Sequence, residues 1–329
     1  MKKTWKLGNT TLENQLILAP MAGYTDSTFR ILCREFGAGL VYTELISSLG
    51  ICFKNEKTFD MLKINPIEHP VSIQLFGSIP EKLAEAAKIS EQAGFDFIDL
   101  NMGCPAPKIL KNGSGGELLR DISQIPPLLK AVVGAVKIPV TLKTRIGYEQ
   151  TDNVVLEVAK MAEQEGAQAI AIHGSTVKQG PIGSRHWEPI RQVKESVSIP
   201  VIANGGIKKP SDILLLMEAT QADAFMIGRA SLGRPWIFSQ ILRILDGEDP
   251  LVIDREKPNP NLLFSTIFRQ IEMMENLKGE YTTIREMRTH IHYYLHSLPE
   301  SSRIKDHVNK AKNKEELLKL LRNYKNTFF

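Results

Sequence analysis

The sequence predicts a (β/α)8 barrel followed by a small all-helical domain, and three observations carry this prediction. Eight short apolar runs recur in the first part of the chain, amphipathic helical patterns separate most of them, and polar or glycine residues follow the runs. Apolar runs with little polar alternation are typical of strands buried on both faces, as in a parallel sheet. Eight such strands alternating with helices favour a barrel over the competing doubly wound open sheet.

The predicted strands are bounded by turn residues, glycine or proline. They lie at 16–19, 40–42, 71–75, 97–100, 140–142, 169–172, 201–203 and 224–227. Three of the intervening helices have apolar residues at helical spacing, and we expect them at 80–92, 151–164 and 210–219. Two of these begin with proline, which fits a helix start because the first amide of a helix has no intrahelical partner.

The end of the chain has a different organisation. Residues 246–260 are polar and contain three prolines, which predicts a linker after a barrel domain at 1–245. Residues 261–329 then show apolar positions at helical spacing, for example Leu263, Ile267 and Ile271. We expect three or four helices there, forming a separate helical domain.

The formal net charge of +4 is unevenly distributed along the chain. Residues 281–329 hold ten Lys and Arg against five Asp and Glu, whereas the other 280 residues hold 31 basic and 32 acidic side chains. Such an asymmetry suggests a polyanionic partner. The alternative is an ordinary solvated helix face.

The three cysteines, Cys33, Cys52 and Cys104, show no CxxC spacing. We therefore expect neither a disulfide framework nor a structural zinc site, and a reducing cytoplasm is the default location. No apolar stretch reaches the ~18 residues that a membrane helix needs, and residues 5–14 lack the apolar core of a secretion signal.

Polar and glycine residues gather at the C-terminal ends of the predicted strands, where barrels bind ligands. In chain order they are Pro20, Met21, Ala22, Gln74, Asn101, Cys104, Lys143, Arg145, His173, Asn204, Gly205, Gly206, Gly228 and Arg229. The set contains no pair of carboxylates and only one histidine, so neither paired-carboxylate hydrolysis nor a metal site is expected.

The glycines after the last two strands suggest a phosphate site. Backbone N–H groups at Gly205, Gly206 and Gly228 can approach an anion closely, and Arg229 adds a fixed cation. The alternative is that these glycines only form tight turns.

Two further side chains, Lys143 and His173, together with Gln74, can offer hydrogen bonds and positive charge to the pyrimidine edge of a reduced flavin. Lys143 ends a buried apolar run and therefore needs a partner or a ligand. His173, taken alone, fits a core histidine equally well.

Cys104 lies between Gly103 and Pro105, which predicts a loop and a side chain outside regular structure. A free thiol there can serve as a general acid, and the alternative is a small buried apolar side chain. We assign that alternative to Cys33 and Cys52.

Several segments together resemble the tRNA-dihydrouridine synthase family. They are APMAGYTD at 19–26, DLNMGCP at 99–105, KTR at 143–145, HG at 173–174, ANG at 203–205 and GRA at 228–230. The segment GRPWIF at 233–238 resembles the bacterial B-type branch. The resemblance extends from about residue 10 to residue 325.

This resemblance implies a flavin barrel followed by a tRNA-binding helical domain. It assigns flavin contacts to Pro20, Met21, Ala22, Gln74, Lys143, His173, Asn204, Gly205, Gly206, Gly228 and Arg229. Cys104 would be the proton donor, and Asn101 and Arg145 would face the uracil or the RNA. We expect Arg285 and Arg288 to contribute to the basic RNA-binding surface. Two positions depart from the family pattern: Ser175 replaces a common Arg, and Gly206 replaces a common Asp.

The implied activity is reduction of a uridine in folded tRNA to 5,6-dihydrouridine. NADPH would reduce tightly bound FMN, the flavin would deliver a hydride, and Cys104 would deliver a proton, in an enzyme expected to act as a cytoplasmic monomer. Two alternatives stay open. One is a flavin barrel that reduces a free pyrimidine or another small molecule, and the other is a non-catalytic RNA-binding protein.

Overall fold

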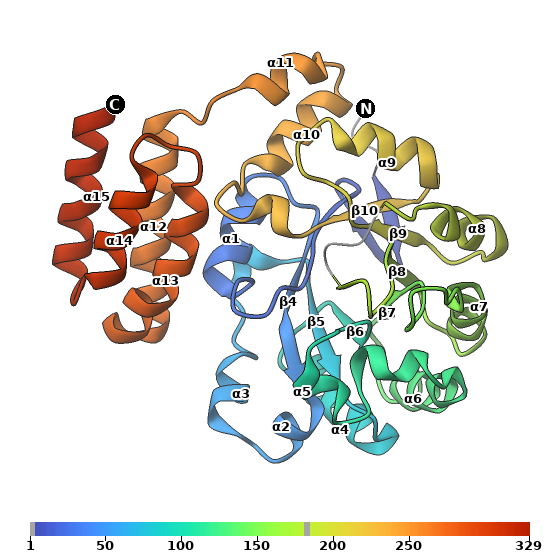
Figure 1. Cartoon of the computed structure of the whole chain (residues 1–329). Coiled ribbons are helices and arrows are strands. Elements are labelled where there is room, and N and C mark those ends of the chain that lie inside the picture. Colours follow the sequence, from blue (N-terminus) through green and yellow to red (C-terminus); the bar gives the residue numbers. More distant parts are fainter. Residues whose placement is uncertain (1–3, 181–184) are drawn as a thin grey trace.

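Eight parallel strands close into a barrel in the computed structural model, which describes residues 4–180 and 185–329 (Figure 1). The strands are β3 (Leu16–Leu18), β4 (Leu40–Ser47), β5 (Val71–Phe76), β6 (Phe97–Met102), β7 (Val140–Arg145), β8 (Ala169–His173), β9 (Val201–Asn204) and β10 (Ala224–Ile227). They are paired in chain order, and β10 pairs with β3 to complete the ring. The predicted barrel is therefore confirmed, and the open sheet is excluded.

Helices surround the barrel and connect its strands. They are α1 (Ser27–Glu35), α2 (Ser48–Cys52), α3 (Glu56–Asp60), α4 (Pro80–Gln92), α5 (Pro107–Leu110), α6 (Ile125–Val133), α7 (Val155–Gln164), α8 (Glu188–Ser196), α9 (Asp212–Thr220) and α10 (Ile237–Leu245). Short 3-10 turns are η1 (Pro66–Glu68), η2 (Gly115–Leu119), η3 (Ile122–Gln124) and η5 (Arg229–Ser231). The apolar faces of the long helices pack on the outer face of the strands, which explains why the strands are apolar on both faces.

Two helices begin later than the sequence predicts, and each follows a loop in which an aspartate side chain accepts from backbone amides. The carboxylate of Asp152 accepts from the amides of Tyr148 and Glu149, and α7 starts only at Val155. In the same way Asp212 accepts from the amides of Lys208 and Lys209 and becomes the first residue of α9.

A hairpin that the sequence analysis did not identify precedes the barrel. Its strands are β1 (Trp5–Leu7) and β2 (Thr10–Leu12), paired antiparallel. Leu7 and Leu12 are fully buried and belong to the same apolar cluster as Tyr42 and other side chains of the barrel interior. The hairpin therefore covers the barrel interior, and the cavity described below lies at the C-terminal ends of the strands.

The predicted linker at 246–260 contains a helix, α11 (Pro250–Arg255). Asp249 caps it, and its one buried apolar residue, Ile253, packs in the barrel core. Asp254 accepts from the ammonium of Lys209 at 2.7 Å. The polar composition predicted a free connection, but one buried side chain and this ion pair attach the segment to the barrel.

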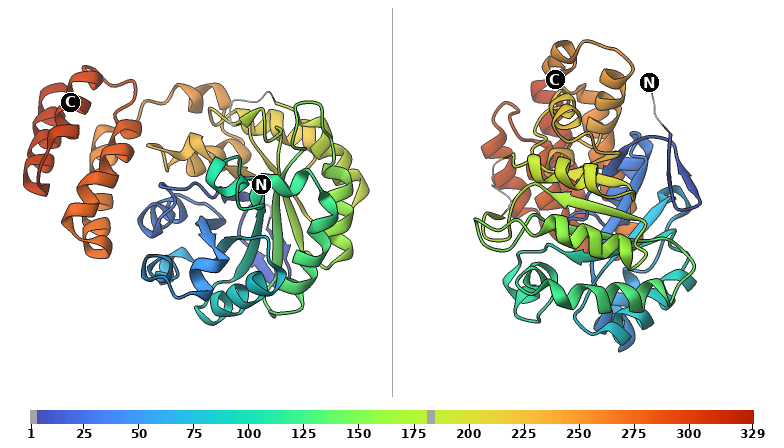
Figure 2. Two further views of the ribbon diagram at one scale, coloured as in Figure 1. Left: turned by 60° about the horizontal axis from the view of Figure 1, so that its bottom comes forward. Right: turned by 90° about the vertical axis from the view of Figure 1, so that its right-hand side faces the viewer.

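Four helices follow, which we call the helical region: α12 (Pro260–Lys278), α13 (Glu280–Tyr294), α14 (Ser301–Lys310) and α15 (Lys314–Phe328). Figure 2 shows them packed together beside the barrel. Their apolar faces form a separate core, which two barrel side chains, Trp236 and Phe36, also join. In the described residues, no helix has both the length and the apolar character that a bilayer crossing requires.

Candidate active site

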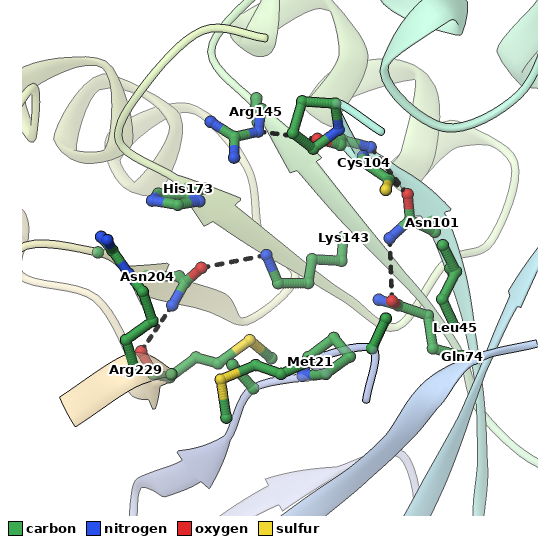
Figure 3. Close-up of a pocket in the computed structure, with 18 of the residues that line it drawn as sticks. Met21, Leu45, Gln74, Asn101, Cys104, Lys143, Arg145, His173, Asn204 and Arg229 are labelled. Atoms are coloured by element: carbon green, nitrogen blue, oxygen red, sulfur yellow. Dashed lines mark hydrogen bonds between the residues drawn. The ribbon is translucent and has the colours of Figure 1, made fainter. Parts of the chain in front are cut away.

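A cavity of about 250 Å³ opens at the C-terminal end of the barrel (Figure 3). Every residue that the sequence analysis placed at a strand end lines this cavity, from Pro20 after β3 to Arg229 after β10. The reason is topological, because the carboxyl ends of parallel strands in a closed barrel meet around one opening. Arg285 and Arg288 are the exceptions, since they lie on α13 outside the cavity.

Apolar side chains also line the cavity, and the sequence analysis did not select them. Leu45 is one, because the predicted second strand ended at Tyr42 whereas β4 continues to Ser47 after a register irregularity between Tyr42 and Leu45. Met226 of β10 and Ile207 after β9 are two others. Such side chains provide the apolar walls that a flat aromatic ligand needs.

A directional chain of hydrogen bonds connects β5 and β6 to the loop that carries Cys104 (Figure 3). The amide nitrogen of Gln74 donates to Asp99 at 2.7 Å, and that of Asn101 donates to the Gln74 oxygen at 2.9 Å. The Asn101 oxygen then accepts the backbone N–H of Cys104 at 2.9 Å. Because an ionised carboxylate only accepts and a backbone N–H only donates, Asp99 at one end and the Cys104 amide at the other fix which way both side-chain amides are turned.

Asp99 belongs to the DLNMGCP segment, and its role follows only from the structure. It is fully buried and also accepts from Thr141 at 2.6 Å. Burial raises the pKa of Asp99 to about 6, against the opposing effect of its hydrogen bonds from Thr141 and Gln74. An acidic residue inside an otherwise apolar strand was the signal that could have identified it.

The loop after β6 is held on both sides of Cys104. Arg145 donates from Nε to the Gly103 carbonyl at 2.8 Å, and Gly116 donates its N–H to the Cys104 carbonyl at 3.0 Å. A Cβ at Gly116 would lie 2.6 Å from Cγ2 of Val177 and 3.1 Å from that carbonyl oxygen, so glycine gives the room for this close approach. Cys104 itself is a free, half-buried thiol at the edge of the cavity.

Arg145 is nearly buried and joins two loops. Besides Gly103, its guanidinium binds the hydroxyl of Ser175 at 2.5 Å and the carbonyl of Thr176 at 3.0 Å. Ser175, one of the two departures from the family pattern, thus serves as an internal partner of Arg145. The arginine faces the cavity, but much of its hydrogen-bonding capacity is used within the protein.

Lys143 lies inside the barrel mouth with its ammonium 3.1 Å from Asn204 Oδ1. The amide of Asn204 is turned this way because its nitrogen donates to the Met226 carbonyl at 2.8 Å. Burial, assisted by the nearby charge of Arg145, lowers the pKa of Lys143 to about 8. One neutral hydrogen-bond partner leaves the charge of this lysine available to a ligand.

His173 ends β8 beside the same opening. Burial, together with the charges of Arg145, Lys143 and Arg229, holds its pKa well below the usual histidine value. The imidazole is therefore neutral at pH 7 and can donate one hydrogen bond and accept another. Among the described residues no hydrogen-bond partner is present for the imidazole, which lines the cavity (Figure 3).

The glycines after β9 form a cradle that a side chain would fill. Gly205 and Gly206 have φ angles of +108° and +85°. A Cβ at Gly205 would lie 2.8 Å from the His173 ring, and one at Gly206 would lie 2.6 Å from Trp187. This accounts for the glycine at position 206, and the glycine backbone with Arg229, which follows the neighbouring strand β10, suits a phosphate group.

The two predicted arginines of α13 have different surroundings. Arg285 is exposed and lies over the ring of Tyr281, 5.5 Å from its centroid. Arg288 donates to the carbonyl of Ala311 at 2.9 Å, and its Nε is buried. Their role in RNA binding stays a prediction, and Arg285 is the more accessible of the two.

Comparison with known sequences gives consistent matches. A sequence model described as dihydrouridine synthase matches residues 17–329. The chain is 40% identical over 308 residues to tRNA-dihydrouridine synthase B of Pseudomonas aeruginosa, covering 94% of this chain and 92% of that protein. It is 39% identical over 323 residues to tRNA-dihydrouridine synthase B of Vibrio cholerae, covering 97% and 98%.

Solved structures share the barrel at much lower sequence identity. Histamine dehydrogenase from Rhizobium sp. 4-9 matches with a TM-score of 0.58 at 16% identity, over 82% of this chain and 50% of that chain. The old yellow enzyme homologue from Zymomonas mobilis matches with a TM-score of 0.55 at 12% identity, over 78% of this chain and 96% of that chain. These likenesses show a common fold.

Proposed function

The chain belongs to the dihydrouridine synthase family and is a flavin-dependent oxidoreductase, and we propose that it reduces a uridine of folded tRNA to 5,6-dihydrouridine. The observation that carries this proposal is the cavity itself. One opening brings together a glycine cradle suited to a phosphate, the cations Lys143, Arg145 and Arg229, and the free thiol of Cys104. Membership of a family of oxidoreductases argues against the non-catalytic RNA-binding alternative.

We propose FMN as the resident cofactor. Gln74, Lys143 and His173 would hold the pyrimidine edge of its ring, and the cradle at Gly205 and Gly206, with Arg229, would hold its phosphate. When bound and reduced, the flavin supplies the hydride for uracil reduction, and NADPH is the proposed source of that hydride. A single phosphate cradle and no GxGxxG fingerprint in the sequence favour FMN over FAD.

The remaining chemistry belongs to the side chains of this protein. Reduction adds a hydride and a proton across the C5=C6 bond of uracil, and the thiol of Cys104 donates the proton to C5. The hydrogen-bond chain from Asp99 through Gln74 and Asn101 holds the backbone of Cys104 in place for this transfer. Free donor capacity of Arg145 is available to a uracil oxygen.

A base can reach this cavity only when it leaves the RNA stack. We propose that tRNA phosphates lie along the exposed cations of the helical region, among them Arg285, Lys310 and Lys312. A free pyrimidine needs no such surface, and this favours tRNA over a small-molecule substrate.

The test is nucleoside mass spectrometry of unmodified tRNA after incubation with the purified protein and NADPH. We expect yellow protein that releases FMN, and a uridine that gains two hydrogen atoms. Free uridine, supplied at the same concentration, should remain unreduced. Colourless protein without flavin would contradict the cofactor proposal, and reduction of free uridine but not of tRNA would contradict the substrate proposal.

A further inference from the structure

Two ion pairs fasten α12 of the helical region to α1 of the barrel, one near each end of α1. Lys278, the last residue of α12, lies 2.8 Å from the carboxylate of Asp26, which caps the N-terminus of α1. Arg269, nine residues earlier in α12, pairs with Glu35, the last residue of α1. The two helices are thus antiparallel, with α1 in contact with the C-terminal half of α12.

The two ends of α1 differ in the segments of chain that adjoin them. Behind Asp26 is the turn that starts at the cavity-lining residues Pro20, Met21 and Ala22. The Thr25 hydroxyl accepts the Met21 N–H at 3.0 Å, and the Met21 carbonyl accepts the amides of Tyr24 and Thr25, each at 3.0 Å. At the other end of α1, Glu35 is followed by β4. The one residue of β4 that lines the cavity is Leu45.

Asp26 is a firm anchor for this turn. It is 7% exposed, accepts the Phe29 amide at 3.1 Å, and accepts the Thr28 hydroxyl at 2.7 Å. Burial opposes its ionisation, but the charges of Lys278 and His290 bring the pKa of Asp26 below its usual value. The carboxylate is therefore ionised at neutral pH and depends on Lys278 for its principal ionic partner.

Lys278 also binds Glu286 of α13 at 2.6 Å, so a single ammonium connects α1, α12 and α13. The α13 side of this corner reaches the turn directly. The ring of Tyr24 meets those of Tyr293 and His290 edge to face, with centroids 5.7 and 5.8 Å apart.

A second cavity, of about 540 Å³, lies beside this corner. Asp26, Glu44, Lys278 and Glu286 are among the residues that line it. On the side of this cavity, the ion pair of Asp26 with Lys278 is therefore not surrounded by close-packed side chains. On the side of the cavity, the charged contacts of Lys278 link the turn to the helical region, whereas the rings of Tyr293 and His290 pack on Tyr24 of the turn.

We propose that Lys278 is a positioning residue for the reduction: through Asp26 it keeps the cavity-lining turn at 20–26 in register with the surface that holds the RNA. This inference rests on the proposed function, because it needs a large substrate that touches both regions at once. A base held by the helical region must enter a cavity whose wall is formed by the turn. A relative shift of about 1 Å in such a geometry can lower the rate of reaction about 10²-fold.

The experiment compares Lys278→Met with Arg269→Met in the full-length, flavin-loaded protein. Each variant removes one cation that crosses the same pair of helices, so loss of anchoring alone affects both. For Lys278→Met we expect turnover at saturating tRNA to fall between about 10- and 100-fold, with KM for tRNA changed less than threefold. Flavin reduction by NADPH without tRNA should be unchanged. Arg269→Met should keep turnover within about twofold of the parent.

Lys278→Arg tests rescue, since a guanidinium can still bind Asp26 and Glu286, and it should recover most of the turnover. If Lys278→Met fails to fold, Lys278→Gln keeps a donor for Asp26 and should show an intermediate fall in turnover. Equal effects of the Lys278 and Arg269 variants, or a change confined to KM, would overturn the proposal. A parent protein that forms no dihydrouridine would instead contradict the proposed function, so the two failures are distinguishable.

Discussion

The cavity and the helical region both carry positive charge, but in opposite surroundings. Lys143, half-buried, and Arg145, buried, lie at the barrel mouth, and desolvation lowers the pKa of both, to about 8 and about 10. Arg285, Lys310 and Lys312 lie on the surface of the helical region, in water. A desolvated charge interacts strongly with one ligand at short range. Each exposed charge interacts weakly and is screened by salt, so that exposed charges have a large effect only when several act together.

This contrast implies a division of work between the two regions. Single substitutions in the cavity should affect the chemical step strongly, whereas the helical region should show its contribution only when several charges are removed together. At the interface between the regions, where Asp26 binds Lys278, a single substitution in the helical region is expected to affect the chemical step as well.

The largest expected effect is that of Cys104→Ala. Removing the proposed acid should lower dihydrouridine formation by about 10²–10⁴-fold, because a positioned acid typically contributes that much. Flavin content, reduction by NADPH and tRNA affinity should stay near the parental values. Cys52→Ala, which removes a half-buried thiol outside the cavity, is the matched control. Parental turnover in Cys104→Ala would place the acid elsewhere.

Gly233→Ala tests how firmly the two regions are packed. Gly233 has a φ of +66°, and an added Cβ would lie 2.2 Å from the backbone of Tyr293 in α13. Left-handed strain and overpacking together should lower the free energy of unfolding by about 3 kcal/mol. Gly247→Ala, at φ +104° with no atom within 4 Å of the added Cβ, should cost only about 1 kcal/mol. Equal midpoints of the two variants in denaturant titration would mean that the backbone around Gly233 and Tyr293 shifts to accommodate the added Cβ.

Removing three exposed cations together, Arg285, Lys310 and Lys312, each to Gln, should weaken tRNA binding about 10- to 100-fold. It should also flatten the dependence of log K on log salt by up to about 2.7. The matched control replaces Lys88, Lys130 and Lys160, exposed cations on the outer helices of the barrel, and changes the net charge by the same amount. Equal losses in both triple variants would show that only net charge matters. Flavin reduction should be unaffected in either.

The smallest effect is a pH dependence that arises from Lys143. Its pKa of about 8 lies below the usual 10.5, so the ammonium is present below about pH 8 and is lost as the pH rises through that value. The rate of flavin reduction by NADPH should therefore decline above about pH 8, by at most about tenfold per pH unit. Lys143→Arg keeps its charge and should remove the decline between pH 8 and 9. A flat profile in the parent would indicate that this charge is not used.

Much of the barrel could be predicted because its strands carry a local pattern. A strand buried on both faces must be apolar throughout, and all eight runs became strands within a few residues of the predicted bounds. Once the strands are in order, a closed barrel dictates that their C-terminal residues meet, and so the cavity-lining set was predictable without any contact information. The DLNMGCP segment, through its resemblance to the family, identified Cys104 as the proposed proton donor.

Other features depended on contacts between residues far apart in the chain. Leu45 could not be chosen from its local pattern, because an irregularity in the pairing of β4 and β5 turns it toward the cavity. In the helix α11 only Ile253 is buried, while Leu251 and Val252 are exposed, and it is the contact of Ile253 with the barrel core that the local sequence could not show. The roles of Asp99 and Arg145 come from hydrogen bonds to residues 25 to 42 positions away.

The sequence by itself determined which residues are apolar, where the chain turns, and which chemical groups follow each strand. The tertiary structure decided how those groups are turned and what they face. Gln74 and Asn101 are amides with two possible orientations, and contacts at both ends of the chain, the buried carboxylate of Asp99 and the backbone N–H of Cys104, select one. Likewise Lys278 is one lysine among many until the packing of α12 on α1 brings it to Asp26, 252 positions away. Local patterns follow from burial and backbone geometry, whereas pairings of charged and polar groups follow from which surfaces meet.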